Sequence, residues 1–211
     1  MSEHALPNQG PGRPKDPAKR QAILDAAKNL FLRNGYEGSS MEAIAREAGV
    51  SKLTVYSHFT DKDTLFCAAV TAKCEERLPH LFVATEHGEP IETCLLEIGR
   101  AFHDLINSEE SLALHRLMFT LAKPNPTLVQ LFYAASATRV LGEMERLLRQ
   151  ADRAGRLQVA NPRSAAEHFC SLLKGGYNFR LLIGCAEERS AAEAELHVRD
   201  VVDLFLRAYR P

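Results

Sequence analysis

The chain has 211 residues, of which 45% are hydrophobic, and its formal net charge is −1. This composition favours a folded globule over a disordered chain and excludes binding of nucleic acid through a general excess of positive charge. An odd number of cysteines with no CxxC pair argues against a disulfide scaffold and for a reducing, cytoplasmic location. No apolar run approaches membrane-spanning length, so no membrane contact is expected.

Residues 1–15 carry Gly, Pro, Asn and Gln without an apolar period, which predicts a flexible N-terminal arm. Within the arm, Pro14 holds Arg13 extended, and Lys15 follows directly. An extended Arg can enter the minor groove of A·T-rich DNA, where negative potential is concentrated. Arg13 and Lys15 are therefore candidate DNA contacts, and a solvated tail is the alternative.

The first helix is predicted to begin at Asp16-Pro17, an N-cap followed by proline at the first helical position. It should end at Asn34-Gly35. Its apolar residues share one face, and they are Ile23, Ala27, Leu30 and Phe31. This helix should support the segment that follows.

The next segment has the pattern of two short helices around a turn. Ser39 and Glu42 have the spacing of a capping box, which predicts the start of a helix. Gly49 should end that helix, because glycine adopts the left-handed conformation without cost. Ser51 should cap a second helix that ends at Phe59. This arrangement is typical of a helix-turn-helix, whose second helix enters the major groove.

The free faces of the second helix carry hydrogen-bond donors and no carboxylate, and these residues are Lys52, Thr54, Tyr56, Ser57 and His58. Such a surface suits a polyanion. A helical protein–protein adaptor is an alternative function, and acidic residues on this helix would have favoured it. A fourth helix should run from Asp61 to about His80. Lys62 in its first turn makes sense if a phosphate docks on the same helix N-terminus.

The segment AIAREAGVSKLTVYSHFTDKDTLF resembles the signature of the TetR/AcrR family of bacterial transcriptional regulators. The matching features are Ala48-Gly49-Val50-Ser51, Tyr56, His58-Phe59, Lys62 and Leu65. The upstream ILDAAKNLFLRNGYEGSSM is similar to the family's first helix and linker, so the resemblance covers about the first third of the chain. Further on, HRLMF, FYAASATRVL and AGRL are similar to an AefR-like C-terminal domain.

The resemblance implies a regulator, most simply a repressor, that binds a palindromic double-stranded DNA operator as a homodimer and is released by a small apolar or aromatic effector. By position, the residues implied to face base edges are Lys52, Leu53 and Thr54. Those implied to hold phosphates are Ser40, Tyr56, Ser57, His58 and Lys62, and Ser51 completes the DNA-binding set. Leu53 departs from the small or polar residue often found there, and it could contact a thymine methyl.

The rest of the chain shows no alternating apolar segment, so no sheet is predicted. Proline, glycine and capping signals predict five more helices, at 90–107, 108–123, 125–154, 161–184 and from 190 almost to the end. The fold class is therefore all-α with about nine helices. Residues 16–61 should form the DNA-binding domain, and residues 62–211 the domain for ligand binding and dimerisation.

The last two helices are apolar around much of their circumference, which requires burial on more than one side. Gly175-Gly176 lies mid-helix, where each Gly costs about 1 kcal/mol relative to Ala, and close approach of another helix would offset that cost. Pairing with a second copy would give a four-helix interface containing Gly175, Gly176, Val201 and Phe205. The alternative is two buried helices of a monomer with an incidental glycine pair.

Aromatic and histidine side chains on the middle helices could line an apolar pocket with a few polar tips. The candidates are Phe102, His103, His115, Phe119, Phe132, Tyr133, Phe169 and Tyr177, and for each of them a place in the plain core is the alternative. No catalytic motif or metal-ligand spacing occurs, so no enzyme, cofactor or metal is expected. A thiol-sensing regulator using Cys94, Cys170 or Cys185 is a further alternative, with small buried residues the simpler explanation.

Overall fold

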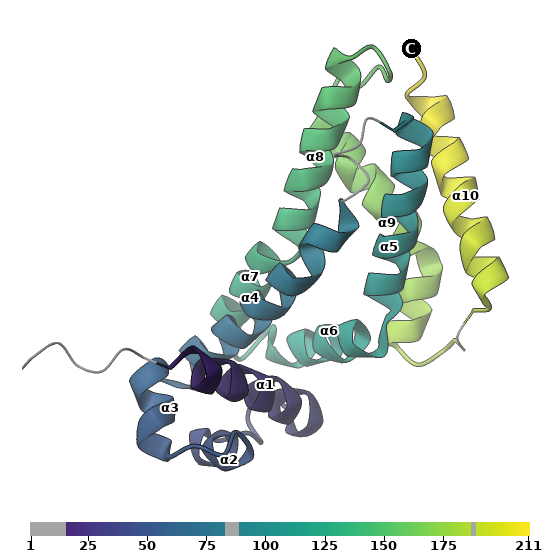
Figure 1. The fold of residues 1–211 in the computed structure, drawn as a ribbon. Helices are drawn as coiled ribbons and strands as arrows, with labels where there is room; N and C mark the ends of the chain where they lie inside the picture. Colours follow the sequence, from purple (N-terminus) through teal and green to yellow (C-terminus); the bar gives the residue numbers. More distant parts are fainter. Residues whose placement is uncertain (1–15, 83–88, 187–188) are drawn as a thin grey trace, which may run out of the picture.

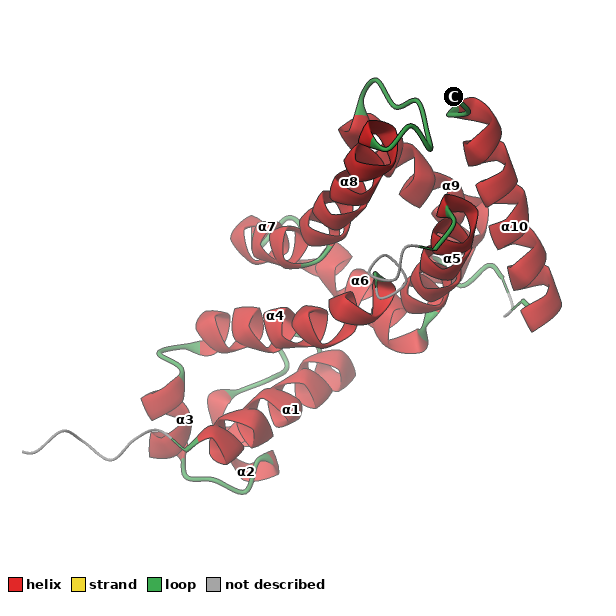
Figure 2. Ribbon diagram, turned by 45° about the horizontal axis from the view of Figure 1, so that its top comes forward, coloured by secondary structure: helices red, strands yellow, loops and turns green. Residues whose placement is uncertain are grey.

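The computed structural model describes residues 16–82, 89–186 and 189–211; the predicted arm with Arg13 and Lys15 lies outside them. These described residues form ten α-helices and no strand, which confirms the predicted all-α class (Figures 1 and 2). None of the helices in this part of the chain is both long and apolar enough to span a bilayer.

Three helices form the compact lower end of the molecule in Figure 1: α1 (Pro17–Asn34), α2 (Met41–Glu47) and α3 (Lys52–His58). The start of α1 is capped as predicted, because the Asp16 carboxylate accepts from the Ala18 amide at 3.0 Å. The helix ends at Gly35, whose φ of 73° is readily adopted only by glycine.

The start of α2 corrects one prediction: Ser40 caps this helix, and Ser39 does not. The Ser40 hydroxyl accepts from the Ala43 amide at 3.1 Å. Ser39 is buried, and its hydroxyl donates to the Gly35 carbonyl at 2.8 Å. Because Ser39 serves the end of α1, the cap passes to the next serine and no capping box with Glu42 forms.

The turn and the second helix follow the prediction. Gly49 has a φ of 66°, and the Val50 amide donates to the Ala45 carbonyl at 3.0 Å, which closes the end of α2. The Ser51 hydroxyl accepts from the Thr54 amide at 3.1 Å and starts α3. The predicted helix-turn-helix is confirmed as a local structure.

Helix α4 (Lys62–Leu81) connects these three helices to the rest of the molecule (Figure 2). It packs against α1 on one side and against α7 and α5 on others. Its buried residues Leu65, Phe66, Ala69 and Val70 belong to the same hydrophobic core as the helix-turn-helix. We call α1–α3 together with residues 62–70 the reading head.

Six helices complete the chain: α5 (Ile91–Asn107), α6 (Glu109–Leu121), α7 (Pro126–Ala135), α8 (Ala137–Arg153), α9 (Pro162–Leu182) and α10 (Ala191–Ala208). The single helix predicted over 125–154 is two helices, since Ser136 leaves the helical conformation with φ −110° and ψ −86°. Its hydroxyl donates to the Phe132 carbonyl at 2.6 Å, which stabilises the break.

A kink in α9 occurs at Gly175, with φ 52° and ψ −169°. This backbone geometry accounts for one glycine of the Gly175-Gly176 pair, because a side chain there would be strained. Beside the kink, the His197 ring of α10 lies 3.0 Å from the Leu173 carbonyl through Nε2. A carbonyl can only accept, so Nε2 is the donor in this contact and ties α10 to α9.

The upper core is built from α5, α8, α9 and α10. Phe169 and Phe205 pack edge to face with ring centroids 5.1 Å apart. Both Val201 and Phe205 are buried within the single chain, which corrects their predicted place in a dimer interface. They face inward because α5 and α9 cover that side of α10.

One ion pair braces α5 against α10. The Arg100 guanidinium donates to both carboxylate oxygens of Glu195 at 2.7 Å, in the bidentate geometry that favours this pair. The hydrogen bond from Arg100 lowers the pKa of Glu195 to about 2, with a further contribution from Arg199. The carboxylate is therefore ionised at any pH near neutral.

Candidate DNA-binding surface and ligand cavity

Helix α3 is anchored by one side and presents the other to solvent. Val55 is fully buried in the reading-head core. Leu53 is 82% exposed, and Tyr56 and Ser57 are also exposed. An apolar side chain as exposed as Leu53 has no role in packing the single chain, which leaves its face of α3 available for a partner.

Lys52 has a partner on α2 that the sequence analysis did not anticipate. Its ammonium pairs with the Glu42 carboxylate, and both side chains are exposed. The hydrogen bond between them raises the pKa of Lys52 and lowers that of Glu42. Glu42 therefore competes with any base or phosphate for the Lys52 ammonium.

The hydroxyl groups of the predicted DNA-binding residues differ in their hydrogen bonds within the chain. Ser40 and Ser51 accept from backbone amides as caps, and Ser57 donates to the Thr54 carbonyl at 2.7 Å. Tyr56 makes no hydrogen bond through its hydroxyl within the described part of the chain, and its ring lies 6.0 Å from the Lys52 ammonium. Tyr56 is thus the phenol best placed to donate to a phosphate.

Lys62 has a structural role as well as its predicted one. Its ammonium donates to the carbonyls of Tyr36 and Ser39, at 3.0 and 3.3 Å, and lies 4.2 Å from the centre of the Tyr36 ring. These contacts fix the loop before α2 to the start of α4. The Glu37 carboxylate lies 4.0 Å from the same ammonium, so a phosphate at this site would compete with Glu37 for Lys62.

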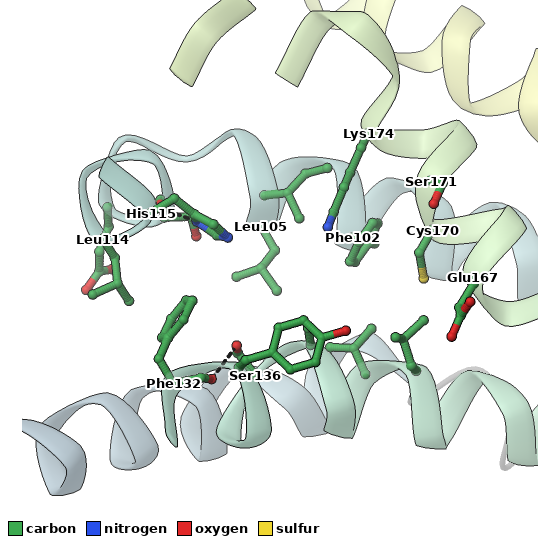
Figure 3. Close-up of a pocket in the computed structure, with 17 residues that line it drawn as sticks. Phe102, Leu105, Leu114, His115, Phe132, Ser136, Glu167, Cys170, Ser171 and Lys174 are labelled. Carbon is green, nitrogen blue, oxygen red and sulfur yellow. Dashed lines mark hydrogen bonds between the residues drawn. The ribbon is translucent and has the colours of Figure 1, made fainter. Parts of the chain in front are cut away.

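A cavity of about 420 Å³ lies among α5 to α9 (Figure 3). Four of the eight predicted ligand-contact residues line it, namely Phe102, His115, Phe132 and Tyr133. Leu105, Leu114, Val140 and Leu141 add aliphatic surface. The structure also brings in polar residues that the sequence analysis missed, and these are Glu110, Ser111, Ser136, Glu167, Cys170, Ser171 and Lys174.

The other four predicted residues do not line this cavity. Phe119 is 62% exposed on α6, and Phe169 is fully buried in the upper core. His103 is buried and stacks on Tyr177, with ring centroids 6.4 Å apart. The Tyr177 hydroxyl accepts from the Arg189 amide at 2.7 Å. The positions of these rings along their helices did not distinguish a place in the cavity wall from a place in the hydrophobic core.

His115 presents a hydrogen-bond acceptor to the cavity. Its Nδ1 lies 2.6 Å from the Ser111 carbonyl, and a carbonyl can only accept, so Nδ1 carries the proton. Burial lowers the pKa of His115, and the positive charge of Lys174 lowers it further. The ring is therefore neutral near pH 7 with an unprotonated Nε2, and it packs edge to face on Phe132 at 5.5 Å.

Phe132 is part of both the cavity wall and the hydrophobic core of the reading head. It lines the cavity, and it is also a member of the hydrophobic core that contains the reading head. Leu114 lines the same cavity and packs against that same core. A second link is the ion pair between Lys28 of α1 and Glu110 of α6, at 3.1 Å. The cavity wall is thus in direct contact with the part of the molecule that carries α3.

The helices α9 and α10 carry several large apolar side chains that are exposed in the single chain. They are Leu172, Phe179 and Ile183 at and after α9, and Leu196 and Leu204 on α10. Gly175 and Gly176 are exposed as well. We call these five apolar residues the α9–α10 apolar face.

Three of the cysteines in the described part of the chain are poor candidates for a redox sensor. Burial is the main factor that raises the pKa of Cys67, Cys94 and Cys170, the last to about 11. Since the thiolate is the reactive form, these three thiols are poorly reactive at neutral pH. Within the described residues, no group of three His, Cys, Asp or Glu side chains could hold a metal ion.

Comparison with known proteins agrees with this geometry. Residues 23–69 match the family of bacterial regulatory proteins named for TetR, and residues 93–211 match the C-terminal domain of AefR-like transcriptional repressors. The first match covers the helix-turn-helix and the start of α4. The second covers all the residues that line the cavity and the whole α9–α10 apolar face.

Several individual proteins are similar. The crystal structure of a TetR-family transcriptional regulator from Mesorhizobium loti is 31% identical, with a TM-score of 0.84, covering 92% of this chain and 98% of that one. The flavonoid-responsive regulator FrrA is 27% identical, with a TM-score of 0.80, covering 93% and 99% of the two chains.

Among curated proteins, the transcriptional repressor Rv1474c of Mycobacterium tuberculosis is 26% identical over 179 residues, covering 85% of this chain and 90% of that protein. The regulator YdeS of Bacillus subtilis is 35% identical over 68 residues, and the chain spans only 34% of its length. Matches of both kinds are to transcriptional regulators and not to enzymes. The chain therefore belongs to the TetR family of bacterial transcriptional regulators, with a C-terminal domain of the AefR-like repressor type.

Proposed function

We propose that this protein is a ligand-responsive repressor that binds a palindromic DNA operator as a homodimer and is released by a small apolar or aromatic molecule. The observation that carries the proposal is the double membership of Phe132, in the cavity wall and in the core of the reading head. A molecule that fills the cavity would contact a residue of the same hydrophobic core that contains Val55 of α3.

The exposed face of α3 is the proposed reading surface. Lys52 and Thr54 supply hydrogen-bond donors, and Leu53 supplies an apolar contact suited to a thymine methyl. Tyr56 supplies a free phenol for a phosphate. A palindromic operator requires two copies of α3 about 34–36 Å apart, so that they enter successive major grooves.

The proposed dimer uses the α9–α10 apolar face. A two-fold axis pairs the same patch on both copies, so each exposed apolar side chain would be covered in both subunits. The exposed Gly175 and Gly176 would let a partner helix approach closely. Phe179, Leu196 and Leu204 take the place of the buried Val201 and Phe205 as interface residues.

The cavity is the proposed effector site. Its volume lies within the range of about 300–1,000 Å³ that small-molecule sites occupy. FrrA, a structural neighbour above 25% identity, is described as flavonoid-responsive, which supports an aromatic effector here. Phe102 and Phe132 would enclose the body of such a molecule.

The proposed release of DNA depends on the contact between the cavity wall and α4. Phe132 lies on α7, and α7 packs on α4, the helix that leaves the reading head. A ligand that pushes α7 would tilt α4 in each subunit and change the separation of the two α3 helices. The ligand must bind this wrongly spaced state more tightly, because equal affinity for both states shifts no equilibrium.

The DNA-binding part of the proposal is tested by Lys52→Ala. An operator sequence is first selected from random DNA with the wild-type protein, and affinities are then measured by fluorescence anisotropy. Lys52→Ala should weaken operator binding by about 1–3 kcal/mol and random DNA much less, because a base contact is lost. Tyr56→Phe should weaken both alike, since a phosphate contact is independent of sequence.

Glu42→Ala is the matched control for Lys52→Ala. It removes the carboxylate that holds the Lys52 ammonium in the free protein, so it should leave operator affinity unchanged or strengthen it. Equal operator affinity in wild type and Lys52→Ala would remove Lys52 from the base-reading set. Failure to select any sequence would contradict the proposed function as a whole.

A further inference from the structure

Three charged side chains line the cavity, and two of them are already neutralised within the chain. Glu110 pairs with Lys28 at 3.1 Å. Glu167 accepts from the Arg163 guanidinium at 3.2 Å. Both carboxylates therefore already have a cationic partner within the chain.

Lys174 is the third, and its situation is different. No carboxylate lies within ion-pair distance of its ammonium in the described part of the chain. Figure 3 shows its side chain reaching from α9 into the cavity toward Phe102, on the side opposite Ser136. Its positive charge is close enough to influence both His115 and Cys170. Glu167 is two helical turns away along α9, about 10.5 Å of rise.

An acceptor and a cation thus face the same apolar space. His115 offers an unprotonated Nε2, because Nδ1 donates to the Ser111 carbonyl. Lys174 offers an ammonium without a counter-charge. Phe102 and Phe132 line the same cavity, and their rings suit an aromatic body.

We propose that the effector is an aromatic anion whose carboxylate, sulfonate or phenolate oxygen pairs with Lys174, and whose hydroxyl group, where it has one, donates to His115 Nε2. The inference rests on the proposed effector role of the cavity and adds the charge of the ligand to it. Lys174 is exposed, so water solvates its ammonium when the cavity is empty. An anionic molecule gains an ion pair there that an uncharged aromatic molecule does not. The competing explanation is a lysine whose aliphatic stem covers the cavity mouth while its ammonium stays in water.

The two explanations are separated by a matched pair of fluorescent probes. Anilinonaphthalene sulfonate and its uncharged parent, phenylnaphthylamine, share one aromatic skeleton, and both fluoresce in apolar sites. Each is titrated into the full-length wild-type protein, Lys174→Met and Lys123→Met. Lys123 is exposed and lies outside the cavity, so Lys123→Met makes the same charge change elsewhere.

Lys174→Met should weaken the sulfonate by about 10- to 100-fold, the range for losing a hydrogen bond between charged groups. It should change the affinity of phenylnaphthylamine by no more than about twofold, and Lys123→Met should affect neither probe. Circular dichroism and a thermal melt confirm that each variant is folded, and Lys174→Gln replaces Lys174→Met if the latter is not. An unchanged preference for the sulfonate in a folded Lys174 variant would overturn the proposal.

Ala137→Trp locates the probes, because Ala137 lines the cavity and the indole would fill it. Loss of both probes in this variant places them in the cavity. If Ala137→Trp abolishes binding of both probes but neither affinity depends on Lys174, the proposed negative charge of the effector is wrong and the cavity remains the proposed effector site. If Ala137→Trp leaves both bound, the cavity does not take aromatic ligands, and both the effector site and the anion proposal are wrong.

Discussion

Phe179→Glu is expected to convert the proposed dimer into a monomer. Phe179 is 61% exposed in the single chain, so its replacement removes little packing from the protomer itself. In the proposed interface it is covered by the partner, and the two-fold axis would bury two glutamates where two phenyl rings had been. Burying unpaired charges is costly enough to dissociate most interfaces. Sedimentation velocity at micromolar concentration should show a monomer with an unchanged helical circular dichroism spectrum.

The same variant should lose most of its affinity for the operator, because a monomer engages one half-site only. Its binding should approach that for random DNA, which is typically weaker by about a thousandfold or more. Leu131→Glu is the matched control, since Leu131 is also an exposed apolar residue but lies on α7 outside the α9–α10 apolar face. A Phe179→Glu protein that remains dimeric would remove this face as the interface.

Phe66→Ala is expected to destabilise the reading head by about 3–5 kcal/mol. Phe66 is 1% exposed, and its ring packs edge to face on Phe31 at 5.1 Å and on Tyr36 at 5.4 Å. Alanine would leave a cavity where α4 meets α1. This cavity would weaken the connection between the reading head and the C-terminal helices. Denaturation in guanidinium chloride, followed by circular dichroism, measures the change in the free energy of unfolding.

Phe119→Ala is the control for that experiment. It makes the same chemical change at a residue that is 62% exposed, so the free energy of unfolding should change by less than about 0.5 kcal/mol. If the two variants unfold at the same denaturant concentration, the contacts around Phe66 do not hold α4 to the reading head.

The helix-turn-helix could be predicted from sequence because its signals are local. The end of the first helix at Gly49 and the start of the next at Ser51 depend on hydrogen bonds that span at most five positions. The misplaced cap at Ser39 shows the limit of such signals. Its hydroxyl donates to a carbonyl at the end of the preceding helix, and capping-box spacing carries no information on that contact.

The break between α7 and α8 gave no comparable signal. Ser136 is neither glycine nor proline, and its neighbours favour helix, so the sequence predicted one continuous element. The structure stabilises the break through the Ser136 hydroxyl and the Phe132 carbonyl. This break matters for function, because Phe132, Tyr133 and Ser136 enter the cavity beside it.

The cavity and the dimer face were predictable as types of surface but not residue by residue. Phe169 and Phe205 have the apolar character expected of a pocket and an interface, yet they pack against each other in the core. Which side of α10 faces inward depends on its packing against α5 and α9, and the pattern within α10 carries no information on that packing. Lys174 is the sequence feature that could have indicated a polar site in the cavity, because it is the one cation in the segment LLKGGYNF.

The most direct test of the proposed mechanism is a pair of calorimetric titrations with an aromatic acid that wild type binds and Ala137→Trp does not. The ligand is titrated once into the free protein and once into the protein saturated with its selected operator. Because coupling between two sites is reciprocal, operator should weaken the ligand by the same factor by which ligand weakens operator, typically about 5- to 150-fold. Indistinguishable ligand dissociation constants in the two titrations would contradict the proposed link between the cavity and the reading head.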